Sequence, residues 1–205
     1  MSAPLAERLR PRTIDEYIGQ EHLVGKNGVF RKFFETGNVP SFILWGPPGV
    51  GKTTLAKIVA TQLDRPFFTL SAVTSGVKDV REVIESARKQ RFFDAKPPFL
   101  FIDEIHRFNK SQQDSLLGAV EQGVVTLIGA TTENPSFEVI SPLLSRCQVY
   151  ILKSLEDKDL QTLLDRALTT DTELKARQIE VKQTGALFKF SLSLIHISEP
   201  TRLRR

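Results

Sequence analysis

The chain has 205 residues, of which 40% are hydrophobic and 25% charged, and its formal net charge is +4. This length allows one full domain and the start of another. The composition argues against a disordered or fibrous protein, and the small charge is only weak evidence for nucleic-acid binding. The single cysteine, Cys147, excludes an intramolecular disulfide, and His22 and His106 have no partners at metal-ligand spacing, so we expect both histidines to be structural. No apolar stretch could span a membrane and residues 1–12 carry no secretion signal, so we expect a cytoplasmic protein without membrane contact.

Apolar runs of strand length alternate with helical patterns between residues 42 and 152. This order is typical of βαβ units, and runs without polar alternation indicate strands that are buried on both faces. The sequence therefore predicts an α/β fold with a five-stranded parallel sheet flanked by helices. The predicted strands are Phe42–Trp45, Pro66–Leu70, Phe99–Ile102, Val124–Ala130 and Gln148–Leu152, and the predicted helices between them are Thr53–Leu63, Val77–Gln90 and Ser111–Gln122.

The strand pattern stops after Lys153. Beyond it, apolar residues recur at helical spacing, and Ser154 with Asp157 resembles a capping box. We therefore place a domain boundary near Ser154, with a nucleotide-binding α/β domain over residues 1–153 and the start of a helical lid over residues 154–191. The apolar positions of the predicted helix are Leu160, Leu163, Leu164, Ala167 and Leu168.

The strongest motif is Gly-Pro-Pro-Gly-Val-Gly-Lys-Thr at residues 46–53, a full match to the P-loop pattern between a predicted strand and a predicted helix. Gly49 and Gly51 let backbone N–H groups surround phosphates at a helix N-terminus. Lys52 would reach the β- and γ-phosphates of ATP, and the Thr53 hydroxyl would bind Mg²⁺. A glycine-rich turn without a ligand is the alternative. The nucleotide contacts expected here are Pro48, Gly49, Val50, Gly51, Lys52, Thr53 and Thr54.

Asp103 and Glu104 follow the apolar run Phe99–Ile102, at the strand end where α/β sheets bind ligands. Asp103 would hold the Mg²⁺ shell. Glu104 points differently, because side chains alternate along a strand, and would polarise the attacking water. Alone, such a pair is more often a solvated turn, but the preceding P-loop favours the catalytic interpretation.

These two motifs, together with Asp-Glu-Ile-His-Arg at residues 103–107 and Ser-Arg-Cys at 145–147, resemble an AAA+ module. The resemblance implies that Thr132, in preference to Thr131, is sensor 1, which contacts the γ-phosphate or the lytic water. Two threonines that cap a turn are the alternative. It also implies that Arg146 is the arginine finger, which enters the ATP site of a neighbouring subunit, whereas a lone arginine is usually a solvated surface charge.

The N-terminal residues 9–11 and 17–20 resemble the segment that closes over adenine in clamp loaders and Holliday-junction motors. Tyr17 would supply a flat apolar surface and Ile18 backbone contacts, although both could be ordinary core residues. The adenine contacts implied by the resemblance are Leu9, Arg10, Tyr17 and Ile18.

Residues 4–11, 42–46, 112–117 and 128–137 resemble the replication-associated recombination protein A family, and the resemblance extends from residue 1 to about 191. It implies an ATP- and Mg²⁺-dependent, DNA-stimulated ATPase at stalled or gapped replication forks. The implied partners are gapped DNA or junctions of single- and double-stranded DNA, further copies of the chain in a homotetramer, and single-strand-binding protein.

Other machines remain open: a Holliday-junction-type motor, a clamp-loader-like scaffold that does not hydrolyse ATP, and a protein unfoldase. Glu104 disfavours the scaffold. Residues 72–78 lack the aromatic residue that unfoldases carry in this loop, and they suit phosphate contact because Lys78 and Arg81 flank a helix N-terminus.

Residues 192–205 leave the family pattern and resemble the translation of a sequencing-library adapter fused to a truncated gene; a short basic tail for nucleic acid is the alternative. A lid that ends after about two helices supplies no sensor 2 arginine, so we expect slow or no ATP hydrolysis by this chain. We also expect partial exposure after Ser154, including the apolar faces of Leu163, Leu164, Leu168, Leu187 and Phe188.

Overall fold

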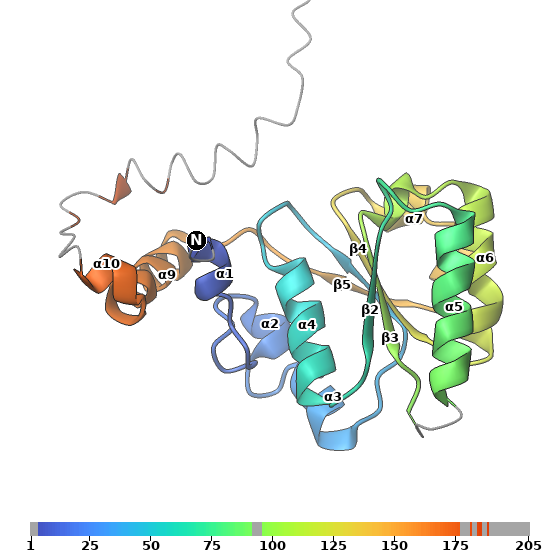
Figure 1. Ribbon diagram of the computed structural model, residues 1–205. Coiled ribbons are helices and arrows are strands. Elements are labelled where there is room, and N and C mark those ends of the chain that lie inside the picture. Colours follow the sequence, from blue (N-terminus) through green and yellow to red (C-terminus); the bar gives the residue numbers. More distant parts are fainter. Residues whose placement is uncertain (1–3, 92–95, 177–180, 182–183, 186–187, 189–205) are drawn as a thin grey trace, which may run out of the picture.

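The fold is a parallel sheet with helices on both faces (Figure 1). The computed structural model describes residues 4–91, 96–176, 181, 184–185 and 188. The strand order is β2-β3-β4-β1-β5, and all neighbours are parallel. The α/β prediction is confirmed, and each strand lies within two residues of its predicted bounds. The strands are β1 (Phe42–Trp45), β2 (Phe67–Ser71), β3 (Phe99–Asp103), β4 (Thr126–Thr131) and β5 (Gln148–Ile151).

Helices cover the sheet in two layers, each with its own apolar core. One layer contains α2, α3 and α4, and the other contains α5 and α6 (Figure 1). The three longer helices between strands match the prediction, whereas the short helices were not predicted, because one helical turn carries too little periodicity to recognise. The helices are α1 (Leu5–Arg8), α2 (Glu21–Val24), α3 (Val29–Thr36), α4 (Lys52–Gln62), α5 (Val77–Arg91), the 3₁₀ turn η1 (Ile105–Arg107), α6 (Lys110–Glu121), α7 (Pro135–Glu138), α8 (Ser141–Leu144), α9 (Asp157–Thr170) and α10 (Thr172–Ala176).

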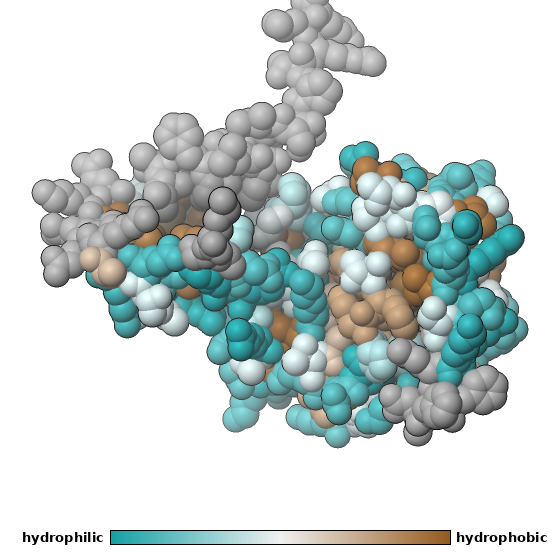
Figure 2. Space-filling view, viewed as in Figure 1, coloured by the Kyte–Doolittle hydropathy of each residue, from teal (hydrophilic) through white to brown (hydrophobic). Residues whose placement is uncertain are grey.

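The two edge strands correct the expectation that all five strands are buried on both faces. The central strands β1, β3 and β4 fit it, but Val149 and Ile151 of β5 are 38% and 52% exposed. At the other edge, Figure 2 shows an apolar area at β2 between the polar surfaces of α4 and α5. Apolar content alone does not reveal which strand lies at an edge, since that depends on the strand order.

The start of α9 also differs from the prediction. Its capping box is formed by Glu156 and Asp159, not by Ser154 and Asp157. The cause lies in the preceding residue Lys153, whose backbone N–H and carbonyl are both bonded to the Gln20 side chain, at 2.8 and 2.6 Å. These bonds hold the chain extended, so the helix begins only after residue 156.

The described residues after Ser154 are only partly covered, as expected for Leu163, Leu164 and Leu168, which are half-buried. Phe188 contradicts that expectation, since it is 9% exposed. Its backbone N–H bonds to the carbonyl of Thr184. Leu187 and residues 192–205 lie outside the described residues. In the described part of the chain, no helix is both long and apolar enough to cross a membrane.

Candidate functional site

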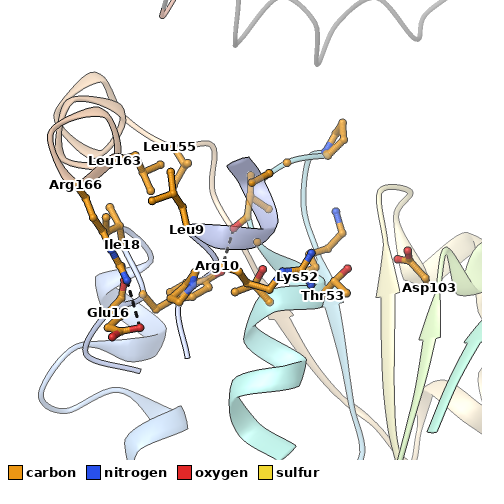
Figure 3. A pocket seen from close by; sticks show the side chains of 18 of the residues that line it. Leu9, Arg10, Glu16, Ile18, Lys52, Thr53, Asp103, Leu155, Leu163 and Arg166 are labelled. Carbon is orange, nitrogen blue, oxygen red and sulfur yellow. Dashed lines mark hydrogen bonds and ion pairs between the residues drawn. The ribbon is translucent and has the colours of Figure 1, made fainter. Parts of the chain in front are cut away.

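A cavity of about 610 Å³ opens between the P-loop, the N-terminal segment and the lid helix α9 (Figure 3). It brings together most of the residues that the sequence singled out, although these come from four separate segments. Thr132 and Arg146 do not line it. The predicted residues that line it are Leu9, Arg10, Tyr17, Ile18, Pro48, Gly49, Val50, Gly51, Lys52, Thr53, Thr54, Asp103 and Glu104.

The two ends of the cavity differ in chemistry. Figure 3 shows Leu9, Leu155 and Leu163 close together at one end, and Lys52, Thr53 and Asp103 toward the other. An apolar end suits the flat face of a base, while an end with backbone N–H groups, an ammonium and carboxylates suits phosphates and a cation.

The P-loop backbone has the shape that phosphate binding requires. Gly49 and Gly51 have φ angles of 77° and 94°, a region that side chains with a Cβ avoid. Tyr17 lies directly against the loop, where its hydroxyl donates to the Val50 carbonyl at 3.0 Å and burial raises the pKa of the phenol. A Cβ on Gly51 would come within 2.6 Å of that hydroxyl oxygen. Tyr17 therefore supports the loop, a contact that its position in the sequence did not indicate.

Lys52 is buried at the centre of the loop. Its ammonium donates to the carbonyls of Gly46 and Pro47 at 2.7 and 2.8 Å. Burial lowers the pKa of Lys52, and the charges of Glu104 and Asp103 oppose that shift. A charged phosphate would be a stronger partner for this ammonium than two neutral carbonyls.

Thr53 and Asp103 offer oxygen ligands inside the same cavity. Burial raises the pKa of Asp103, and the Glu104 charge adds to that effect. A divalent cation would remove this cost by pairing with the carboxylate. The pair suits Mg²⁺, because this ion keeps several waters and takes few protein ligands beside substrate phosphates.

Glu104 lies just past β3 with a left-handed backbone, at φ 52°. Its Oε2 accepts a hydrogen bond from the Thr132 hydroxyl at 3.3 Å and lies 3.1 Å from Nδ1 of His106. The same Nδ1 lies 3.0 Å from the hydroxyl of the buried Thr131. The structure thus places Thr132 against the carboxylate, and it adds His106, which sequence reasoning treated as structural. Its position two residues after Glu104, on the turn that leaves the strand, was the available signal.

Arg146 lies after α8, outside the cavity. Its guanidinium forms an ion pair with Glu121 at 2.5 Å and donates to Ser145 Oγ at 3.1 Å, on a part of the surface that solvent reaches. The structure therefore does not bring Arg146 to the P-loop of its own chain.

The lid adds three cavity residues that the sequence did not single out as binding residues: Leu155, Leu163 and Arg166. Arg166 donates to the Glu16 backbone carbonyl at 2.7 Å and lies 3.3 Å from its carboxylate. This pair joins α9 to the N-terminal segment beside the cavity (Figure 3). The helical period around Leu163 was visible in the sequence, but the face directed at the cavity was not.

Comparisons with known proteins agree with this geometry. A model of the ATPase family associated with various cellular activities, the AAA family, matches residues 42–155. Among solved structures, the Thermotoga maritima RuvB Holliday junction branch migration motor is 35% identical with a TM-score of 0.65, covering 78% of this chain and 54% of that chain. The chain therefore belongs to the AAA family of ATPases.

Curated relatives show which members of the AAA family the chain resembles. Replication-associated recombination protein A of Escherichia coli K12 is 52% identical over 169 residues, covering 82% of this chain and 38% of that protein. The protein of the same name from Haemophilus influenzae is 50% identical over 165 residues, covering 80% and 37%. ATPase WRNIP1 of Dictyostelium discoideum is 51% identical over 177 residues, covering 86% and 20%. These relatives confirm the resemblance to replication-associated recombination protein A, and the chain spans well under half of their length.

Proposed function

We propose that this chain binds ATP with Mg²⁺ in the cavity beneath α9 and is the ATP-hydrolysing core of a longer factor that acts on DNA in replication and recombination, while hydrolysis by this chain alone should be slow or absent. The observation that carries the proposal is one cavity with an apolar end and a phosphate end. The residues at the phosphate end fit the needs of phosphoryl transfer, and the relatives named above supply the biological setting.

Hydrolysis joins a water oxygen to the γ-phosphorus while the bond from that phosphorus to the ADP oxygen breaks. Glu104 accepts the proton that the water loses. Lys52 and the backbone N–H groups around Gly49 and Gly51 stabilise the charge on the phosphoryl oxygens. Thr132 contacts the γ-phosphate or the attacking water. Mg²⁺, held through Thr53 and Asp103, supplies further neutralisation of phosphate charge when bound.

Two variants separate binding from turnover. In a full-length relative that carries the same residues, Lys52→Ala should abolish tight ATP binding in a calorimetric titration. Glu104→Gln should keep binding and block phosphate release, because only this second residue acts on the water. Lys57→Ala is the matched control, since Lys57 lies on the same helix, is exposed and does not line the nucleotide cavity. Equal ATP affinity for Lys52→Ala and the parent chain would contradict the proposal.

The DNA partner is proposed from the relatives rather than from a surface on the chain. At the helix N-terminus that the sequence suggested for phosphate contact, the Asp79 carboxylate accepts from the N–H of Gly76 at 2.6 Å, and this negative charge disfavours a phosphate there. Lys78 also lies 3.7 Å from Glu82. Residues 72–78 therefore offer less to a phosphate than their sequence indicated.

A RuvB-like motor is the second candidate, favoured by the structural similarity to that protein. Phosphate release should be compared in the presence of gapped duplex, forked duplex, a four-way junction and an unfolded polypeptide. Stimulation by gapped or forked DNA supports the first proposal, stimulation by the four-way junction alone supports the motor, and stimulation by polypeptide alone contradicts both. Single-strand-binding protein and the proposed homotetramer can then be tested by co-sedimentation with the full-length protein.

A further inference from the structure

Four polar side chains meet where β3 and β4 end, next to the nucleotide cavity. Glu104 and His106 come from the turn after β3, and Thr131 and Thr132 come from the end of β4. The His106 side chain is only 13% exposed. Its Nδ1 lies within hydrogen-bond distance of both Thr131 Oγ1, at 3.0 Å, and Glu104 Oε2, at 3.1 Å.

The contact with Glu104 decides which nitrogen of His106 carries the proton. An ionised carboxylate only accepts hydrogen bonds, so the 3.1 Å contact between Nδ1 and Glu104 Oε2 requires a proton on Nδ1. Thr131 Oγ1 lies 3.0 Å from the same nitrogen and can donate its own proton to the Glu133 carbonyl, at 3.2 Å. The Nδ1–H group is therefore shared between Thr131 Oγ1 and Glu104 Oε2.

The two carboxylate oxygens of Glu104 differ in their hydrogen bonds. Oε2 accepts from the Thr132 hydroxyl and from His106 Nδ1–H. No hydrogen bond to Oε1 occurs within the part of the chain that the structure describes. One oxygen is thus held by the protein and the other is left available.

We propose that His106 is a positioning residue for ATP hydrolysis: anchored on Thr131, its Nδ1–H holds Oε2 of Glu104 and so directs Oε1 to accept the proton of the attacking water. This inference rests on the proposed role of Glu104. The backbone of Glu104 is left-handed, at φ 52°, a conformation that is uncommon outside glycine and that gathers at active sites. A histidine that only filled space would not need this tautomer.

The tautomer can be read without any catalytic turnover. The chain has three histidines, so ¹⁵N-imidazole labelling gives few signals, and the signal lost in His106→Asn identifies residue 106. We expect the Nδ1–H tautomer in the parent chain, and in Thr131→Val as well, because Glu104 Oε2 remains as its acceptor. An Nε2–H tautomer in the parent chain would overturn the proposal, whatever the hydrolysis rate.

Single-turnover hydrolysis by a full-length relative that carries the same residues, with protein in excess over ATP, tests the positioning role. His106→Ala should slow the chemical step by about 10- to 100-fold, the range for residues that orient a reacting group, with ATP affinity unchanged. His106→Asn, whose amide N–H lies where Nδ1–H was, should stay within about threefold of the parent, whereas His106→Gln, whose amide lies near the Nε2 position, should be as slow as alanine.

One result excludes a merely structural role. His106→Ala in the Glu104→Gln background should leave the residual single-turnover rate unchanged, since the group that His106 positions is gone. Equal loss in the Asn and Ala variants, or a loss of ATP affinity that matches the loss of rate, would overturn the proposal. Absence of hydrolysis in the full-length relative together with the Nδ1–H tautomer would refute the proposed activity and leave the contact supported.

Discussion

Replacing Gly51 by alanine tests how the P-loop is supported. Gly51 has a φ of 94° and immediately precedes α4, and a Cβ there would lie 2.6 Å from Tyr17 Oη and 3.1 Å from two ring carbons of Tyr17. An alanine in left-handed backbone costs about 1–2 kcal/mol. Overpacking against a buried ring adds about 1–3 kcal/mol. We therefore expect a loss of about 2–5 kcal/mol in the free energy of unfolding, together with weaker ATP binding.

Tyr17→Phe divides this loss into its parts. By itself it removes the 3.0 Å hydrogen bond to the Val50 carbonyl, which should cost about 1 kcal/mol. In the Gly51→Ala background it also removes the nearest clashing atom, so the double variant should be more stable than the sum of the single effects by about 1 kcal/mol. The backbone strain at residue 51 remains in Gly51→Ala and in the double variant.

Urea unfolding of the four proteins measures these values, with ATP affinity followed by titration. Gly118→Ala is the matched control, because Gly118 lies within α6 and a Cβ there would meet nothing within 4 Å. It should stabilise the chain by about 0.5–1 kcal/mol, the helix preference of alanine over glycine. A Gly51→Ala variant as stable as the parent, or strictly additive effects with Tyr17→Phe, would refute the reasoning.

Two further predictions concern Arg146 and the attachment of the lid. If Arg146 acts in a neighbouring ATP site, mixing Arg146→Ala with Glu104→Gln subunits of a full-length relative that carries the same residues should change activity with the mixing ratio. The control variant Glu121→Gln, which frees the Arg146 guanidinium, should not lower activity. Strict additivity of the two mixed populations would exclude a role for Arg146 in a neighbouring site. Hydrogen bonds from Arg8 at 2.7 and 3.0 Å lower the pKa of Asp171 to about 2. Because the unfolded pKa is about 3.9, the ionised carboxylate stabilises the folded chain above that pH, and this stabilisation is lost as the pH falls toward 2. Urea unfolding should therefore show Asp171→Asn less stable than the parent at pH 7 and the difference shrinking between pH 4 and 2, with the exposed Asp165→Asn as control; a difference that does not change with pH would contradict it.

The phosphate end of the site could be predicted from the sequence because one contiguous segment builds it. The turn from β1 into α4 needs left-handed backbone at Gly49 and Gly51, and it needs a helix N-terminus directly after them. These requirements restrict the residue types at fixed spacing, so the motif can be recognised in the sequence. The same is true of Asp103, which ends a buried strand.

The apolar end could not be predicted to the same extent, because separate segments build it and many side chains would serve. Leu9 comes from the N-terminal segment, while Leu155 and Leu163 come from the lid. Any apolar residue of suitable size could fill these places, so no spacing rule marks them. The start of α9 was misplaced for a related reason: a distant side chain, Gln20, fixes the backbone at Lys153.

Three ion pairs link the N-terminal segment to the residues after Ser154: Arg8 with Asp171 and with Glu173, and Arg166 with Glu16. All three join the parts that carry the apolar end of the cavity, and none involves the P-loop. The apolar end is therefore held together by contacts between chain segments, whereas the phosphate end is held by local backbone geometry. A base that enters between Leu9 and Leu163 would contact both segments at once, so its binding would strengthen the same attachment that the ion pairs provide. Nucleotide affinity should therefore depend on the attachment of α9 to the N-terminal segment, through residues that lie far apart in the sequence.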